Sequence, residues 1–342
     1  MNSVVAADYS IPANGDVTEV APGVLWLRMP LPFDLDHMNL YLLDDIDGWV
    51  VVDCGLGNTD SQDVWERVAT EFLNGKPIKK VIVTHAHIDH IGAAGWLCRR
   101  WNVPLWITAG ELQTGQEYFH ASEDSVAQLR AEKSRFLHRM GMSSEQSAGV
   151  VDLSSSIATL VQPLPVDQYE IQDGMKLEIG NRQWRVIVSE GHSVAHASLY
   201  CEALGVLISG DQVLPRISSN VSVRVDNPEG NPLLSWLHSL ERMKELPEQT
   251  LVLPAHEYPF HGLRQRLSEL DLEHRDMLTR IEQACTEPQT VMQLVAVIYR
   301  RKLSLFDQLL AGGECLAHLH YLLAEQRIRR EEGSDGCLRF TR

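Results

Sequence analysis

The chain has 342 residues, with 30 Lys and Arg against 46 Asp and Glu, so its net charge is −16. A protein this acidic repels nucleic acid and anionic membranes over most of its surface, and no apolar run reaches the roughly 20 residues that span a bilayer. We therefore expect a cytoplasmic protein, without a signal peptide, that binds neither nucleic acid nor a membrane and is long enough for one large and one small domain.

The first third of the chain predicts short strands separated by turns, with two helices among them. Helical spacing of apolar residues predicts a helix over residues 63–73, and a polar loop over residues 85–95 opens another helix toward Trp101. Alternating or continuous apolar residues predict strands at residues 23–29, 39–43, 49–52, 81–83 and 103–107.

The middle of the chain predicts a helical insertion and then more strands. Residues 111–149 have helical spacing and no strand character, which indicates an arm inserted between strands. A further helix is expected at residues 233–246. Strands of this part are expected at residues 176–179, 184–188, 197–201, 206–209 and 250–253.

After residue 275 the pattern is three helices and a hairpin. The helices are predicted at residues 276–285, 291–302 and 314–326, and the strands at 328–330 and 337–341. Gly312-Gly313 is expected to break the chain before the third helix. This order is typical of a winged helix, so we predict a catalytic domain over residues 1–270 and a winged-helix-like domain over residues 275–342.

The strongest chemical signal is the segment Thr84-His85-Ala86-His87-Ile88-Asp89-His90. Three imidazoles and a carboxylate within six residues place several lone-pair donors close together, an arrangement that indicates a bound cation. His85 and His87 are separated by one residue, so in an extended loop their side chains point the same way and can coordinate one ion. Asp89 and His90 follow at the turn into a helix, where they face a neighbouring position. These ligand types suit zinc, and iron and manganese also accept them.

Other metal-capable residues follow the ends of later apolar strands. They are His192, Asp211 and His256. Asp53 follows the apolar strand at residues 49–52 in the same way. Strand ends are rigid places on which to build a site. Together with the histidine loop, His192, Asp211 and His256 complete two ligand sets.

With these motifs in this order, the chain resembles the metallo-β-lactamase-fold hydrolase superfamily over roughly residues 18–262. The resemblance rests on H-x-H-x-D-H at residues 85–90, G-H-S-V-A-H at 191–196, S-G-D at 209–211 and P-A-H at 254–256. It implies an α/β fold, an αββα sandwich with the metal ions at one edge of the two sheets. The tail is similar to the C-terminal winged helix of lactamase-β-like proteins.

The resemblance also implies a set of roles for the site residues. It assigns His85, His87 and His192 to one divalent metal ion and Asp89, His90 and His256 to another, with Asp211 bridging both. Asp53 and His196 are expected to lie outside the ligands, where Asp53 orients them. Two ions that share a water lower its pKa, so that metal-bound hydroxide attacks the substrate while Asp89 handles the proton.

The function that we expect is hydrolysis of a small ester, thioester or lactone, because the acidic surface favours a small-molecule substrate over a polyanion. The alternative is a metal-dependent single-strand endoribonuclease that uses the winged helix. The complete set of ligand types argues against a non-catalytic protein and against a redox enzyme with one iron. His37 and Arg216 are candidate substrate contacts, and the tail is expected to be a packing or homodimer-forming appendage.

Overall fold

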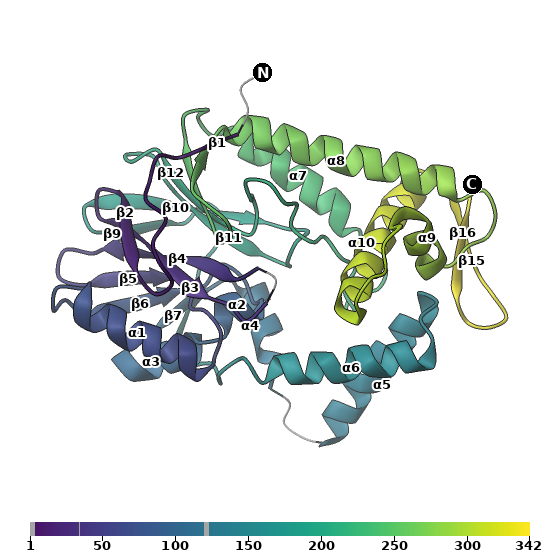
Figure 1. Cartoon of the computed structure of the whole chain (residues 1–342), viewed down its shortest axis with the longest axis horizontal. Coiled ribbons are helices and arrows are strands. Elements are labelled where there is room, and N and C mark those ends of the chain that lie inside the picture. The colour runs from purple at the N-terminus through teal and green to yellow at the C-terminus, as the bar shows by residue number, and fades with distance from the viewer. Residues whose placement is uncertain (1–3, 34, 120–122) are drawn as a thin grey trace. The chain divides into compact units, whose positions relative to one another are not determined.

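The structure is a computed structural model that describes residues 4–33, 35–119 and 123–342. The chain forms two compact units, and Figure 1 shows its elements in chain order. The first unit consists of Met1–Phe119, Ile157–Ser219 and Met243–Leu267, and the second of His120–Ser156, Asn220–Arg242 and Ser268–Arg342. Each unit is therefore assembled from segments that lie far apart in the sequence.

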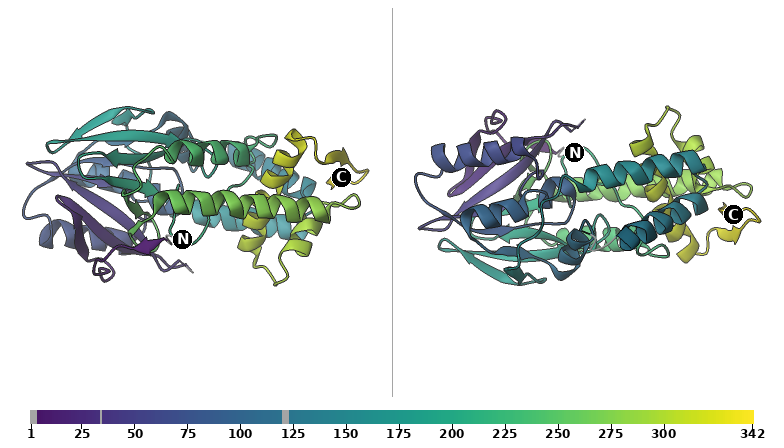
Figure 2. Two further views of the ribbon diagram at one scale, coloured as in Figure 1. Left: turned by 90° about the horizontal axis from the view of Figure 1, so that it is seen from above. Right: turned by 90° about the horizontal axis from the view of Figure 1, so that it is seen from below.

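The first unit contains two seven-stranded sheets, which Figure 2 shows as separate layers. The first sheet has the order β2 (Val17–Ala21), β3 (Val24–Pro30), β4 (His37–Asp44), β5 (Trp49–Val52), β6 (Ile78–Ile82), β7 (Leu105–Ile107) and β8 (Gln168–Glu170). The second has the order β1 (Val5–Ala6), β14 (Phe260–His261), β13 (Leu251–Pro254), β12 (Val206–Gly210), β11 (His196–Cys201), β10 (Arg182–Ser189) and β9 (Lys176–Ile179).

Apolar side chains from both sheets fill the space between them. Trp26 of the first sheet belongs to the same buried cluster as Trp184 of the second. The neighbouring residue Leu27 points to the other face of its sheet, as alternation along a strand requires. There it packs in one cluster with Trp65 of α1 (Thr59–Glu71) and Leu97 of α3 (Ala94–Trp101). The predicted α/β class, with two sheets forming a sandwich, is confirmed.

Parallel pairing gathers several strand ends at one edge. Strands β5, β6 and β7 run parallel to one another, and β12 runs parallel to β13. The carboxyl ends of parallel strands meet at the same edge of a sheet. The loops that follow these strands therefore lie close together, and they carry the histidines and aspartates of the sequence motifs.

Helices make up most of the second unit. They are α5 (Glu123–Arg139), α6 (Ser144–Ala158), α7 (Pro232–Met243), α8 (Leu263–Ala284), α9 (Val291–Ile298) and α10 (Leu305–Ala324), followed by the hairpin of β15 (Arg329–Glu332) and β16 (Leu338–Thr341). The insertion predicted over residues 111–149 is helical, but it is divided. Ser143 caps the N-terminus of α6. Its hydroxyl accepts the N–H of Gln146, and Gln146 Oε1 accepts the N–H of Ser143.

The predicted order of three helices and a hairpin in the tail is observed, but three predicted boundaries are wrong. Helix α9 ends at Ile298 and not at residue 302. Helix α8 begins at Leu263 and not at residue 276, since the buried leucines 267, 270 and 278 continue one apolar face. The break predicted at Gly312-Gly313 is absent, because both glycines lie inside α10. The assignment of this tail as a winged helix stays a prediction.

Close packing explains the two glycines inside α10. A Cβ atom on Gly313 would lie 2.5 Å from Ser222 Oγ, and one on Gly312 would lie 2.6 Å from Met140 Cε. The backbone of Gly313 also accepts a hydrogen bond from the N–H of Val223 at 3.2 Å. The contact with Ser222 leaves no room for a side chain at Gly313, and this close packing outweighs the low helix propensity of glycine.

We expect Gly313→Ala to destabilise the protein, although alanine is the better helix former. The added methyl group must displace Ser222, and such overpacking costs about 1–3 kcal/mol, against a gain of about 1 kcal/mol from helix propensity. Urea denaturation measures the change. Adding Ser222→Gly, which removes the opposing side chain, should recover part of the lost stability, whereas a raised midpoint for Gly313→Ala alone would contradict the explanation.

Candidate metal centre

Strand ends deliver all the candidate metal ligands to one edge of the first unit. The segment His85–His90 follows β6, and His192 lies between β10 and β11. Asp211 directly follows β12, and His256 follows β13. Because the ends of buried strands hold their backbones firmly, each side chain enters the site from a rigid support.

The first ligand group consists of His85, His87, His192 and Asp211, whose metal-capable atoms all lie within 4.8 Å of one another. His85 Nε2 lies 2.8 Å from His87 Nδ1 and 3.2 Å from His192 Nε2. Asp211 Oδ2 lies 3.4 Å from His192 Nε2. Ligands at about 2.1 Å from a tetrahedral ion are separated by about 3.4 Å, so the group has the size that one ion requires.

The second ligand group consists of Asp89, His90 and His256. Asp89 Oδ2 lies 3.5 Å from His256 Nε2 and 3.8 Å from His90 Nε2. Asp211 reaches this group as well, since its Oδ2 lies 3.5 Å from His90 Nε2 and its Oδ1 lies 3.5 Å from His256 Nε2. One carboxylate therefore stands between the two groups.

Two buried atoms at the centre of the site fit a cation. His90 Nε2 and Asp211 Oδ1 have no hydrogen-bond partner within the part of the chain that the structure describes. A buried polar atom without a partner costs about 1–3 kcal/mol. A divalent ion would contact both atoms, so the residues present fit a metal.

Outer contacts fix the orientation of two of the histidines. His90 Nδ1 lies 2.8 Å from Asp53 Oδ2, which directs Nε2 toward the other ligands. The backbone N–H and the hydroxyl of Thr84 also donate to Asp53, whose φ of +64° is one that aspartate tolerates. His256 Nδ1 donates to the backbone carbonyl of His37 at 3.1 Å. Such contacts set the tautomer and ring orientation of a metal ligand.

His196 lies beside the site but belongs to neither ligand group. Its Nε2 accepts the backbone N–H of Asp211 at 3.2 Å, and the ring is fully buried. The contact holds the turn that presents the Asp211 carboxylate.

Glu111 is a residue of the site that was not predicted, and it is fully buried in α4 (Ala109–Gln116). Its Oε2 accepts the N–H of Ala86 at 2.8 Å, and its Oε1 accepts the N–H of Ala195 at 2.7 Å. These two residues lie in the loops that carry His85, His87 and His192. No sequence signal identified Glu111, because a glutamate in the first turn of a helix is ordinary.

The two candidate substrate contacts are both engaged by neighbouring residues. His37 Nδ1 lies 2.6 Å from Asp36 Oδ1 and 3.0 Å from Arg28 Nη2. Arg216 donates from Nε to Glu257 Oε1 at 2.8 Å, with 67% of its side chain exposed. Both residues therefore lie close to His256 in the chain's own hydrogen-bond network, and their contact with a substrate stays a prediction.

The imidazoles of His85 and His87 are neutral. Burial, together with His90 and His87, lowers the pKa of His85 well below its usual value. Burial and the neighbouring His192 lower the pKa of His87 to about 3. An unprotonated nitrogen is the form that binds a metal ion, so His85 and His87 are prepared for one without losing a proton.

The second ligand group holds protons that a metal ion would displace. Burial alone would lower the pKa of His256, but Asp211 and Asp89 raise it to about 9. Burial also opposes the charged form of His90, yet the surrounding carboxylates raise the pKa of that residue well above its usual value. The same pairing outweighs burial at Asp89 and holds the pKa of its carboxyl at about 2.

Metal binding to the second group is therefore expected to release about two protons at pH 7.5, one each from His256 and His90. The pKa values of both histidines are raised, that of His256 to about 9, so protons compete with the ion for their nitrogens at lower pH. Affinity for the ion should therefore rise with pH between pH 6 and 8. Calorimetry in buffers with different heats of ionisation counts the protons. Binding that releases none and has the same affinity across this range would contradict the assignment of charges.

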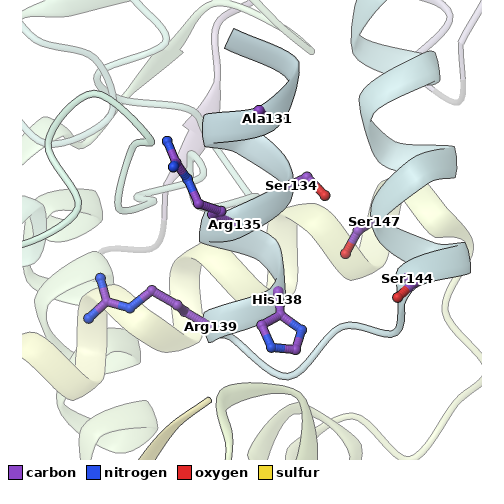
Figure 3. Close-up of a pocket in the computed structure, with 7 residues that line it drawn as sticks. All are labelled: Ala131, Ser134, Arg135, His138, Arg139, Ser144 and Ser147. Atoms are coloured by element: carbon purple, nitrogen blue, oxygen red, sulfur yellow. The ribbon is translucent and has the colours of Figure 1, made fainter. Parts of the chain in front are cut away.

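A separate hollow lies between α5 and α6 of the second unit, with a volume of about 480 Å³. Figure 3 shows Ser134 of α5 and Ser147 of α6 on facing sides of it. Ala131, Arg135, His138, Arg139 and Ser144 complete its lining. One histidine without a carboxylate is not a metal-ligand set, so the lining of this hollow does not offer a second metal centre.

Comparison with known proteins identifies the family. Residues 34–256 match the model described as "Metallo-beta-lactamase superfamily", a span that includes both ligand groups. The chain belongs to the metallo-beta-lactamase superfamily. Residues 278–342 match a second model, described as "Metallo-beta-lactamase-like, C-terminal domain". The resemblance inferred from the motifs is confirmed, and the superfamily accounts for both parts of the chain.

Relatives extend over nearly the whole chain. A beta-lactamase domain protein from Burkholderia ambifaria has a solved structure that is 42% identical, with a TM-score of 0.89, and the match covers 99% of this chain and 98% of that one. The probable metallo-hydrolase YqjP of Bacillus subtilis is 23% identical over 320 residues, 89% of this chain and 93% of that protein. Hydroxyacylglutathione hydrolase of Hahella chejuensis is 23% identical over 322 residues, 92% and 93% of the two chains.

Membership of the superfamily, together with the His and Asp clusters, supports a hydrolase that binds divalent metal ions. Among the helices that the structure describes, none combines the length and apolar character that crossing a membrane requires.

Proposed function

We propose that the protein is a hydrolase that binds two divalent metal ions, zinc above all, and cleaves a small ester, thioester or lactone. The observation that carries the proposal is Asp211, whose two oxygens approach the nitrogens of both ligand groups. Two ions bound there would activate a water and polarise the carbonyl oxygen of the substrate. A relative named hydroxyacylglutathione hydrolase, a hydrolase of a thioester, supports this substrate class.

The residues around the ligands have separate tasks in this proposal. His85 and His87 offer neutral nitrogens, and Asp53 keeps the lone pair of His90 directed inward. Asp89 is the carboxylate that handles the proton. Its side chain is 18% exposed, whereas that of His90 is fully buried, so Asp89 can take a proton from the attacking water and deliver it to the leaving group.

The ion pairs of the tail support a small-molecule substrate over RNA. Arg330 pairs with Glu229 at 2.7 Å, Arg339 pairs with Asp335 at 2.7 Å, and Arg327 pairs with Glu282. An arginine held by a carboxylate must leave that partner before it can neutralise a phosphate. We therefore propose that the cytoplasmic enzyme binds neither nucleic acid nor a membrane, and that its tail serves packing or homodimer formation.

Elemental analysis together with a hydrolysis panel tests the proposal. The panel holds acyl thioesters, lactones, a β-lactam and a labelled single-stranded RNA. We expect about two zinc-like ions per chain and turnover of a thioester, an ester or a lactone. Cleavage of RNA alone would overturn the substrate class, and a chain that binds no metal would overturn the mechanism.

A further inference from the structure

The carboxylate of Glu111 joins the two loops that supply the histidines of the first ligand group. It accepts the N–H of Ala86 at 2.8 Å with one oxygen and the N–H of Ala195 at 2.7 Å with the other. Ala86 lies between His85 and His87, and Ala195 lies in the same loop as His192. The first loop follows a strand of one sheet and the second joins two strands of the other.

Residues on either side of α4 bind the backbone carbonyls of the same two residues, Ala86 and Ala195. The hydroxyl of Thr108 donates to Ala195 O at 2.8 Å, and the hydroxyl of Tyr118 donates to Ala86 O at 3.1 Å. Each of the two residues is therefore bound at its N–H by Glu111 and at its C=O by a residue next to α4. Because each peptide unit is planar, the two contacts fix the peptide planes on both sides of the residue, and with them the direction of the backbone next to the ligating side chains.

Helix α4 lies close enough to the loops to make these hydrogen bonds because residue 110 is glycine. A Cβ atom on Gly110 would lie 3.1 Å from Val194 Cγ2 and 3.3 Å from the Cβ of Ala195. The helix therefore packs directly on the second loop, and Glu111 reaches both loops from its first turn.

A role limited to packing does not account for the residue at this position. Glu111 is fully buried, and burying a carboxylate is costly unless charge-assisted hydrogen bonds offset the loss of water. Its two oxygens bond to the two loops that carry ligands. An apolar side chain would fill the same space without holding either loop.

We propose that Glu111 is a positioning residue that fixes His85 and His87 relative to His192, and thereby sets how tightly the first ligand group binds a divalent metal ion. This inference rests on the proposed metal-dependent function. Glutamine keeps the shape of the side chain, but one of its ends is an NH₂ group that cannot accept an N–H donor. Glu111→Gln therefore loses one of the two loop contacts while occupying the same volume.

Titration with Co²⁺ against a competing chelator tests the inference in two backgrounds. His256→Ala leaves the first ligand group complete, and His87→Ala leaves the second complete. In the first background, Glu111→Gln should weaken Co²⁺ binding by about 10–100-fold, the usual effect of losing an outer contact, and should shift the visible spectrum of the bound ion. In the second background, the dissociation constant should change by less than about threefold.

A matched control uses the residue that follows the end of the same helix. Glu117 is exposed six residues further along the chain, so Glu117→Gln removes the same charge and should leave the dissociation constants unchanged. Unchanged Co²⁺ binding in Glu111→Gln, or equal weakening in both backgrounds, would overturn the inference. If Glu111→Gln loses its near-ultraviolet circular dichroism, the same titrations are made with Thr108→Val, which removes the hydrogen bond to Ala195 O. The same results then support or overturn the inference. An unmutated chain that binds no Co²⁺ would instead overturn the proposed function.

Discussion

Replacing Asp211 with asparagine is expected to lower hydrolysis by about 1,000-fold or more and to remove most of the bound metal. The two carboxylate oxygens of Asp211 serve both ligand groups, at 3.4 Å from His192 Nε2 and 3.5 Å from His256 Nε2. An amide has one oxygen and no charge, so it cannot hold two cations. Loss of metal-assisted catalysis removes several kcal/mol of transition-state stabilisation, and each 1.4 kcal/mol corresponds to a tenfold change in rate.

Elemental analysis and initial rates on the best substrate of the panel measure the two effects. Asp60→Asn is the matched control, because Asp60 is exposed in the first turn of α1, and its substitution should leave both the metal content and the rate within about twofold. Near-ultraviolet circular dichroism checks that the Asp211 variant is folded. A folded Asp211→Asn chain that keeps two ions and hydrolyses at the unmutated rate would contradict the bridging role.

The residues of the two candidate ligand groups stand out in the sequence because each follows the end of a strand, and most of these strands are buried. Strands that are covered on both faces read as continuous apolar runs, as at residues 49–52 and 206–208, and the polar residue that follows such a run stands out. The segment His85–His90 stands out further because of its composition. Local sequence therefore indicates both the strand and the residue at its end.

The outer contacts are less predictable because they depend on the meeting of distant segments. Glu111 binds the backbone of Ala86 and Ala195, which are 25 and 84 residues away. A backbone N–H is present at every residue except proline, so the sequence does not show which ones a carboxylate will bind. The two-residue strands β1 and β14 are unpredictable for a similar reason, since β1 exists through its pairing with β14, and β14 through its pairing with β1 and β13.

The errors in the helical part have different causes. Helix α8 could have been extended to Leu263 from the spacing of its leucines alone. The glycines of α10 could not have been placed inside a helix from the sequence, because the evidence is their contact with Ser222 and Met140. Glycine favours a break in isolation, and tertiary packing reverses that preference.

Replacing Asp89 with asparagine should separate catalysis from metal binding. The ligands of the first group, His85, His87 and His192 with Asp211, remain intact in this variant, so at least one ion is expected to stay bound. Asparagine cannot accept the proton of the attacking water, and loss of a general acid–base group lowers the rate by about 10²–10⁴-fold. We expect this loss in kcat, with a smaller change in KM.

Assays with excess divalent ion distinguish the two roles that Asp89 combines. If Asp89 acted as a ligand alone, a saturating concentration of Zn²⁺ would refill the second group and restore most of the rate. If it transfers the proton, the rate stays low when both ions are present. The other carboxylate beside His256 is that of Asp211, which is less exposed than Asp89 (11% against 18%) and is a candidate ligand of both ions. Recovery of full activity at saturating Zn²⁺ would therefore assign Asp89 to metal binding and remove it from proton transfer.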